Sequence, residues 1–150
     1  MRLVVQRVKE ASCTVEGKIT GEISRGFMVL VGMGTGDDRE TVRKMAVKLS
    51  RLRVFEDSEG KMNLDIYAAG GSILSISQFT LYADASRGNR PSFTDAMKGD
   101  EANELYEYFN SCLEELDIRV EKGIFGADMA VKLWNDGPVT VILDSKELFK

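Results

Sequence analysis

The spacing of short apolar runs is the feature that most narrows what this chain can fold into. Strand-like runs recur at residues 2–9, 12–15, 19–23, 27–31, 53–56, 62–66, 72–82, 118–124, 129–134 and 139–143. Clusters of turn-forming residues separate many of them, as in strands joined by tight turns. Only residues 37–52 and 100–116 have helical periodicity. Because helices and strands do not alternate regularly, we predict an α+β fold, a curved and mostly antiparallel β-sheet or barrel with two amphipathic helices.

The first helix should begin near Asp37, because Glu40 follows three residues later as in a capping box. Its apolar side is formed by Val42, Met45, Ala46, Leu49 and Leu52. Much of the remaining surface is basic and carries Arg39, Arg43, Lys44, Lys48 and Arg51. Such a face is either ordinary solvated surface or a surface for a partner, and the sequence leaves both open. The second helix should turn Leu105, Tyr108, Phe109, Cys112, Leu113 and Leu116 inward.

The segment Asn135-Asp136-Gly137-Pro138-Val139-Thr140 lies between two strand-like runs and therefore predicts the tip of a hairpin. Asn, Asp, Gly and Pro are all common in turns, so a plain turn is the simplest interpretation. Gly137 also allows the backbone to approach another molecule closely, and Pro138 fixes its own φ. A rigid dipeptide with bare carbonyls could serve as a steric gauge.

The overall composition suits one domain spanning residues 1–150, with 43% hydrophobic residues available for a core. No apolar run approaches the ~20 residues of a membrane span, and the first residues lack the apolar middle of a signal peptide. Cys13 and Cys112 are far apart and are expected to be small core residues, which favours a cytoplasmic location. The net charge of −4 argues against broad binding to nucleic acid, DNA included. A local basic patch on one RNA end remains possible.

The chain contains no histidine. This excludes Ser-His-Asp and Cys-His catalysis and histidine-ligated zinc. The carboxylates Asp57, Asp65, Asp84 and Asp128 have no paired metal-ligand spacing, so we expect no metal and no cofactor. Residues 32–36 are glycine-rich but lack the spacing of a dinucleotide or P-loop motif, and we interpret them as a flexible loop.

Two short motifs together carry a family resemblance. Ser77-Gln78-Phe79-Thr80 and the segment from Asn135 to Thr140 match the two signatures of the D-aminoacyl-tRNA deacylases, also called D-tyrosyl-tRNA deacylases. Residues 6–8, 60–64, 87–93 and 125–129 match further blocks, so the resemblance covers nearly the whole chain. Either short motif alone would be weak, but both occur in the right order and at the right length.

The resemblance implies a homodimer with its site at the subunit interface. The family hydrolyses the ester between a D-amino acid and the 3′-terminal adenosine of tRNA. Gly137-Pro138 would have a cis bond and enter the partner's pocket, where its carbonyls exclude an L side chain but admit a D-amino acid or glycine. Exclusion of one hand needs rigid backbone, because favourable side-chain contacts would instead select among amino acids. Arg7 would brace this loop; otherwise it reads as a strand residue with its head in solvent.

Two accounts of the chemical step remain open. In one, Thr80 or Ser77 attacks the ester, although no histidine or nearby lysine is available to activate a hydroxyl. In the other, the ribose 2′-hydroxyl of the substrate assists a water molecule, and the protein supplies positioning and backbone N–H donors. The lack of histidine favours the second account. It assigns Ser77, Gln78, Phe79 and Thr80 to pocket shape and hydrogen bonding, with the N–H groups near Phe79 and Thr80 as oxyanion donors.

The remaining expected site residues surround these motifs. Phe125, Met129 and Asn135 should support the pocket, although Met129 equally suits a core position. Arg87, Arg90 and Lys98 are candidates for contacts with the tRNA end. The alternatives are an ester hydrolase with Thr80 as nucleophile and an RNA-end-binding module without catalysis.

Overall fold

The computed structural model describes residues 1–150, and its regular elements follow the chain in a simple order. They are β1 (Arg2–Val15), β2 (Lys18–Ile23), β3 (Gly26–Gly32), α1 (Arg39–Ser50), β4 (Phe55–Glu56), β5 (Met62–Leu64), α2 (Ile66–Ala69), β6 (Ser72–Ser77), the 3₁₀ turn η1 (Phe79–Tyr82), α3 (Gly99–Glu115), β7 (Val120–Lys122), β8 (Ala130–Asp144) and α4 (Ser145–Leu148). No helix among them is long and apolar enough to cross a membrane.

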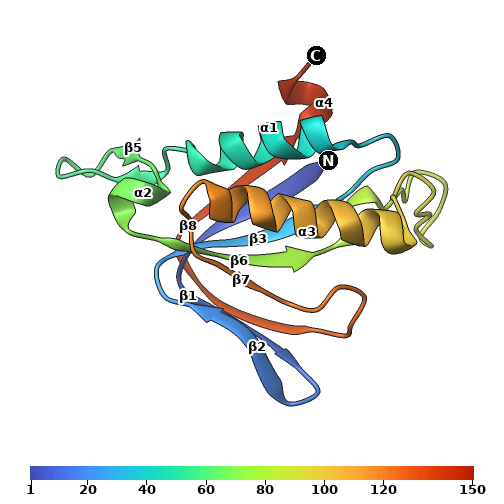
Figure 1. The fold of residues 1–150 in the computed structure, drawn as a ribbon, viewed down its shortest axis with the longest axis horizontal. Helices are drawn as coiled ribbons and strands as arrows, with labels where there is room; N and C mark the ends of the chain where they lie inside the picture. The colour runs from blue at the N-terminus through green and yellow to red at the C-terminus, as the bar shows by residue number, and fades with distance from the viewer.

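One curved six-stranded sheet organises the molecule. Its strand order is β2-β1-β3-β6-β7, and β8 pairs with the other side of β1. The β3–β6 and β6–β7 pairs are parallel and the other pairs are antiparallel. Helices α1 and α3 lie side by side over one face (Figure 1), while α2 and α4 are single turns. The predicted α+β class with a curved, mostly antiparallel sheet and two main helices is confirmed.

The sheet has a hydrophobic core on each face. The larger core contains 24 buried residues and fills the space between the sheet and the two long helices. The smaller contains seven, among them Val8, Cys13 and Ile76, inside the curl of the strands. Cys13 and Cys112 are both buried free thiols, as predicted. In α3 the fully buried tyrosine is Tyr106, and Tyr108, which we expected to face inward, is only half-buried.

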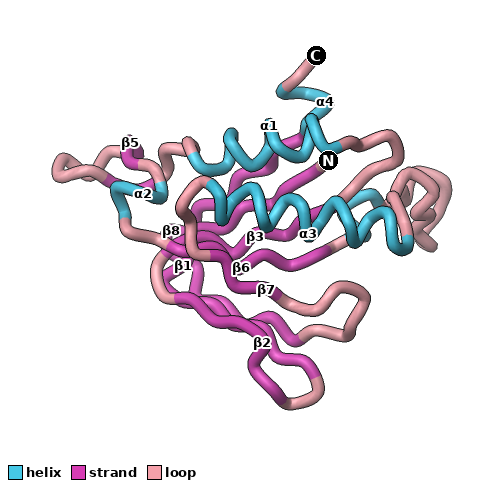
Figure 2. The backbone as a smooth tube through the Cα atoms, in the orientation of Figure 1, coloured by secondary structure: helices cyan, strands magenta, loops and turns pink.

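Strand β1 touches more of the sheet than any other element. The two runs predicted at residues 2–9 and 12–15 form one continuous strand of 14 residues. Its first half pairs with β3 and its second half with β2, while β8 runs along its other side. Figure 2 shows that β1 and its neighbour β8 are long strands. It also shows long loops near the N-terminal end of α3.

The predicted hairpin at Asn135–Thr140 is wrong. Residues on both sides of this segment belong to β8 and pair with β1 in the same direction, so the chain does not reverse. The register passes from the Val8–Asn135 pair to the Gln6–Thr140 pair, which leaves residues 136–139 opposite Arg7 alone. Turn-forming residues here build a wide bulge, a feature that redirects a strand without ending it.

The strand predicted at residues 72–82 is also shorter than expected. Strand β6 ends at Ser77, and η1 follows as a 3₁₀ turn closed by bonds from the Leu81 N–H to the Gln78 carbonyl and from the Ala83 N–H to the Thr80 carbonyl. The glycine-rich loop packs against this turn. A Cβ on Gly34 would lie 2.6 Å from the Tyr82 hydroxyl, so this part of the predicted loop is closely packed against η1.

The N-cap of α1 is Asp38, whose side chain accepts a hydrogen bond from the Thr41 N–H at 2.9 Å. The capping box predicted from Asp37 and Glu40 is therefore wrong by one residue. Asp37 has another partner, because its carboxylate pairs with the N-terminal amine at 2.6 Å. Near the C-terminus, residues 145–148 form α4, and Ser145 Oγ accepts a bond from the same amine.

Candidate active site

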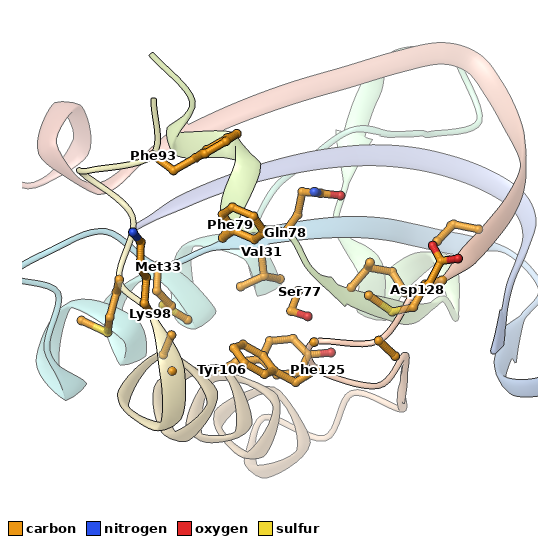
Figure 3. Close-up of a pocket in the computed structure, with 18 residues that line it drawn as sticks. Val31, Met33, Ser77, Gln78, Phe79, Phe93, Lys98, Tyr106, Phe125 and Asp128 are labelled. Atoms are coloured by element: carbon orange, nitrogen blue, oxygen red, sulfur yellow. The ribbon is translucent and has the colours of Figure 1, made fainter. Parts of the chain in front are cut away.

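A cavity of about 670 Å³ opens where β6 ends. Its walls come from η1, the start of α3 and the loop that precedes β8 (Figure 3). It contains Ser77, Gln78 and Phe79 of the first motif, together with Phe125, Met129 and Lys98 of the predicted site. Most of its lining is apolar, as in typical small-molecule sites. The structure thus brings six of the predicted residues to one cavity.

Neither hydroxyl group of the first motif is hydrogen-bonded to a base. Thr80 Oγ1 accepts a hydrogen bond from the side-chain amide of Gln78. An amide in either orientation cannot take a proton from a hydroxyl near neutral pH. Thr80 itself is exposed and does not line the cavity. Ser77 lies in the cavity wall together with Tyr106 and Phe125, and Figure 3 draws its side chain among the labelled lining residues.

Two backbone N–H groups at the start of η1 are free. The first N–H groups of a helical turn have no partner within it. Those of Phe79 and Thr80 also donate to no other carbonyl or side chain of the protein, whereas the neighbouring Gln78 N–H bonds the Val31 carbonyl at 2.8 Å. Phe79 lines the cavity, so its N–H is available to a ligand oxygen there, and that of Thr80 follows it in the chain.

Aromatic rings form both the mouth and the inner wall. Phe79, about half exposed, meets Phe93 edge-on with ring centroids 5.1 Å apart. Deeper in the cavity, Tyr106 packs near Phe125 and donates a hydrogen bond to the Ser75 carbonyl at 2.7 Å. The sequence analysis missed Phe93 and Tyr106 as site residues. Phe93 could have been found, since it ends the matched block at residues 87–93.

The cavity carries one side chain of each charge, Lys98 and Asp128. Asp128 belongs to the matched block at residues 125–129, which the resemblance implies at the pocket, and it lies in the wall. Arg87 and Arg90 are exposed in a loop closed by paired hydrogen bonds between Asp84 and Ser92, and neither lines the cavity. Met129 does both things expected of it, lining the cavity and packing against the smaller core.

The Arg7 side chain supports the Gly137-Pro138 segment through hydrogen bonds. The Arg7 side chain is buried, so the expectation that it would otherwise point to solvent does not apply. Its Nε donates to the Asp136 carbonyl at 3.1 Å, and its Nη1 donates to the Val54 carbonyl at 2.6 Å. Its charge faces the carboxylates of Asp136 at 3.5 Å and Glu56 at 4.0 Å. The Gly137–Pro138 peptide bond is cis, as the resemblance implies.

The held segment and the cavity lie at different places along the sheet. Ser77 pairs with Val31, which pairs with Leu3, whereas Arg7 pairs with Phe27. Four residues of strand separate Leu3 from Arg7, or roughly 13 Å. Asn135, Gly137 and Pro138 are exposed, and none of them lines the cavity of their own chain.

Comparison with known proteins shows the fold and the family of this chain. A solved structure named c-Myc DNA Unwinding Element Binding Protein is 39% identical, with a TM-score of 0.90, and the match covers 96% of this chain and 98% of that one. Another, described as a structural analysis of a probable eukaryotic D-amino acid tRNA deacylase, is 18% identical with a TM-score of 0.78 over 95% of this chain and 97% of that one, which shows a shared fold. The family model described as D-Tyr-tRNA(Tyr) deacylase matches residues 4–144. The chain therefore belongs to the D-Tyr-tRNA(Tyr) deacylase family.

Proposed function

We propose that this protein is a homodimeric D-aminoacyl-tRNA deacylase that works in the cytoplasm. It hydrolyses the ester between a D-amino acid, or glycine, and the 3′-terminal adenosine of tRNA. The observation that carries the proposal is the buried Arg7, which fixes the carbonyl next to Gly137. A main chain fixed in this way can exclude one hand of an amino acid without selecting among side chains.

The gauge acts in the partner's cavity. In its own chain the Gly137-Pro138 segment lies roughly 13 Å along the strand from the cavity level, so it needs a second protomer to meet a substrate. Strand β8 favours such a partner, because its 15 residues pair only on the β1 side. It also exposes Trp134 and Ile142. Long unpaired edges are normally covered in native proteins.

The chemical step relies on placement. The free N–H groups of Phe79 and Thr80 receive the developing oxyanion, and the 2′-hydroxyl of the terminal ribose assists the attacking water. Phe79 and Phe93 offer ring faces for the terminal adenine, since aromatic side chains commonly stack unpaired bases. Thr80 is unsuited as a nucleophile because its partner is an amide and not a base.

The test is a deacylation assay with D-tyrosyl-, L-tyrosyl- and glycyl-tRNA side by side. We expect the D-tyrosyl and glycyl esters to be cleaved and the L-tyrosyl ester to persist. A D-tyrosyl ester on a tRNA that ends in 2′-deoxyadenosine isolates the role of the 2′-hydroxyl, and loss of its cleavage supports substrate assistance. Equal cleavage of D- and L-tyrosyl-tRNA would overturn the selectivity mechanism.

A non-catalytic role in binding nucleic acid is the second candidate, because the 39% identical structure is named as a DNA-element-binding protein. The negative net charge of this chain speaks against binding duplex DNA broadly. The same assay decides: binding of charged tRNA with no release of amino acid favours this second candidate.

A further inference from the structure

The C-terminal part of α1 borders a surface hollow that has no part in the proposed function. It measures about 450 Å³ and is lined by Lys44, Val47, Lys48, Arg51, Leu52, Arg53 and Phe149. Its charged residues are all cations, although the whole chain has a net charge of −4. Concentrated positive charge on an acidic protein marks a site for an anionic partner.

Two of the four cations that line this hollow, Lys48 and Arg51, have no ion-pair or side-chain hydrogen-bond partner. On α1, Arg39 pairs with Glu104 at 3.0 Å and Lys44 pairs with Glu40 at 3.1 Å. Arg53 bonds the Asn63 carbonyl at 3.0 Å. Lys48 and Arg51 remain exposed and unpaired beside them. Cations near a helix C-terminus also interact favourably with the helix dipole and so stabilise the fold. A test must therefore separate an effect on binding from an effect on stability.

The hollow is tied to the Gly137-Pro138 segment by a short covalent and hydrogen-bonded path. Arg53, in its wall, directly precedes Val54, whose carbonyl accepts a bond from Arg7 at 2.6 Å. The same guanidinium bonds the Asp136 carbonyl next to Gly137. If Gly137-Pro138 enters the partner's cavity, the hollow of the same protomer lies near the entrance of that cavity. This step rests on the proposed function.

We propose that the hollow around Lys48 and Arg51 binds backbone phosphates of the tRNA whose 3′ end occupies the partner's cavity. One protomer then supplies the ester-binding cavity and the other supplies both the gauge and a phosphate contact. Phosphate contacts of this kind fix the register of a nucleic acid without reading its sequence.

The test compares two substrates with the intact protein. The Lys48→Gln/Arg51→Gln variant removes the two unpaired cations, and Lys18→Gln removes an exposed cation in the β1–β2 hairpin, which Figure 1 shows at the opposite end of the molecule from α1. D-tyrosyl-tRNA carries phosphates, whereas the D-tyrosyl ester of adenosine carries none. We expect the double variant to raise KM for D-tyrosyl-tRNA about tenfold at low salt. Its salt dependence should fall by about two units of log–log slope, one for each cation removed, and the adenosine ester should react unchanged.

The outcomes separate the hollow from the proposed function and from stability. Lys18→Gln should match the wild type on both substrates, and Lys48→Arg/Arg51→Lys should restore tRNA affinity. An unchanged KM for tRNA in the double variant overturns the proposal. So does an equal rise in KM for D-tyrosyl-tRNA and for the adenosine ester. A lowered unfolding midpoint large enough to explain the rise in KM also overturns it. If the wild type cleaves neither ester, the proposed function fails; filter binding of uncharged tRNA by the same variants then still tests the hollow. Equally tight binding of duplex DNA, lost in the same variant, would overturn tRNA as the occupant.

Discussion

Two arginines on one strand hold the two signature segments, and they do so in different surroundings. Arg2 donates to the Leu81 carbonyl of η1 at 2.9 Å and pairs with Asp144 at the same distance, and its side chain is 38% exposed. Arg7 donates to the Asp136 carbonyl beside Gly137, and its side chain is 6% exposed. The turn at the cavity is therefore braced in partial contact with water, and the gauge is braced inside the protein.

This difference matches the demands on each segment. A group that excludes one enantiomer works only as well as it resists displacement, so its support has to be stiff. A buried guanidinium with fixed carbonyl partners provides such support, because loss of either partner leaves polar groups unsatisfied in the interior. A turn that presents N–H donors to a reacting ester needs orientation. A half-exposed ion pair suffices to provide it.

The largest effect is expected from Arg7→Ala. The substitution leaves the Val54 and Asp136 carbonyls without their donor, so the free energy of unfolding should fall by about 3 kcal/mol in a denaturant titration. The preference for D- over L-tyrosyl-tRNA should fall about 100-fold. Arg25→Ala, which removes an arginine stacked on Phe55, is the control and should keep the preference. An Arg7→Ala protein that retains full selectivity would contradict the bracing role.

Gly137→Ala should damage selectivity with a smaller effect on folding. A Cβ there would lie 2.9 Å from the Val139 N atom, and the residue has a φ of 130°. The loop has to shift, at about 1–3 kcal/mol. We expect the ratio of kcat/KM for D- and L-tyrosyl-tRNA to fall about tenfold.

The matched control for this change is Gly17→Ala. Gly17 also has a positive φ, of 78°, but a Cβ there would meet nothing within 4 Å. It therefore carries the backbone strain without the displaced loop, and it should lower stability slightly while leaving selectivity intact. Equal selectivity losses in both variants would mean that general destabilisation, and not the gauge, sets the ratio.

These two segments also mark the limit of what the sequence could predict. The apolar runs located β3, both long helices and the β1–β2 hairpin, because burial and periodicity are local properties. Asn, Asp, Gly and Pro suit a reversal and a bulge equally well. Only the pairing of both halves of β8 with β1 decides for the bulge. The burial of Arg7 likewise depends on Val54 and Asp136, which are distant in sequence.

The residues of the cavity were predicted more completely than the contacts by which Arg7 supports the Gly137-Pro138 segment. The Ser77–Thr80 motif and residues 125–129 pointed to it through the family resemblance, and Ser77, Gln78, Phe79, Phe125 and Met129 do line it. Tyr106 was missed because helical periodicity allowed either Tyr106 or Tyr108 to face inward. The free N–H groups of η1 were expected, but the 3₁₀ turn that presents them was read as the end of a strand.

Asp144→Asn tests the weaker of the two braces. Burial alone would raise the pKa of Asp144, but the Arg2 hydrogen bond, the Lys146 backbone N–H and the charges of Arg2 and the N-terminal amine together lower it. A carboxyl with a lowered pKa in the folded state stabilises the protein above its unfolded-state pKa, and this contribution is lost as pH falls through the folded value. The variant should lose about 1 kcal/mol at pH 7, since the pair is partly exposed.

Between about pH 5 and pH 2, wild type and Asp144→Asn should converge in stability, because the wild-type carboxyl becomes protonated. Urea titrations across this range measure the convergence. Asn can still accept the Lys146 N–H bond that caps α4, so the comparison isolates the charge. A difference that stays constant down to pH 2 would show that the ion pair with Arg2 contributes nothing.

Thr80→Val should have the smallest effect, and its size separates the two accounts of the chemistry. The variant keeps the shape of Thr80 and the backbone N–H but removes the hydroxyl, which has only the Gln78 amide as partner. If the substrate's 2′-hydroxyl assists the water, single-turnover cleavage of D-tyrosyl-tRNA should slow less than about tenfold. Removing a true nucleophile typically costs more than about 10⁴-fold. Mass spectrometry of the quenched wild-type reaction should find no acyl adduct. A trapped adduct on Thr80 would mean that η1 takes part in covalent chemistry. Positioning of N–H donors alone would then not explain why Arg2 holds this turn.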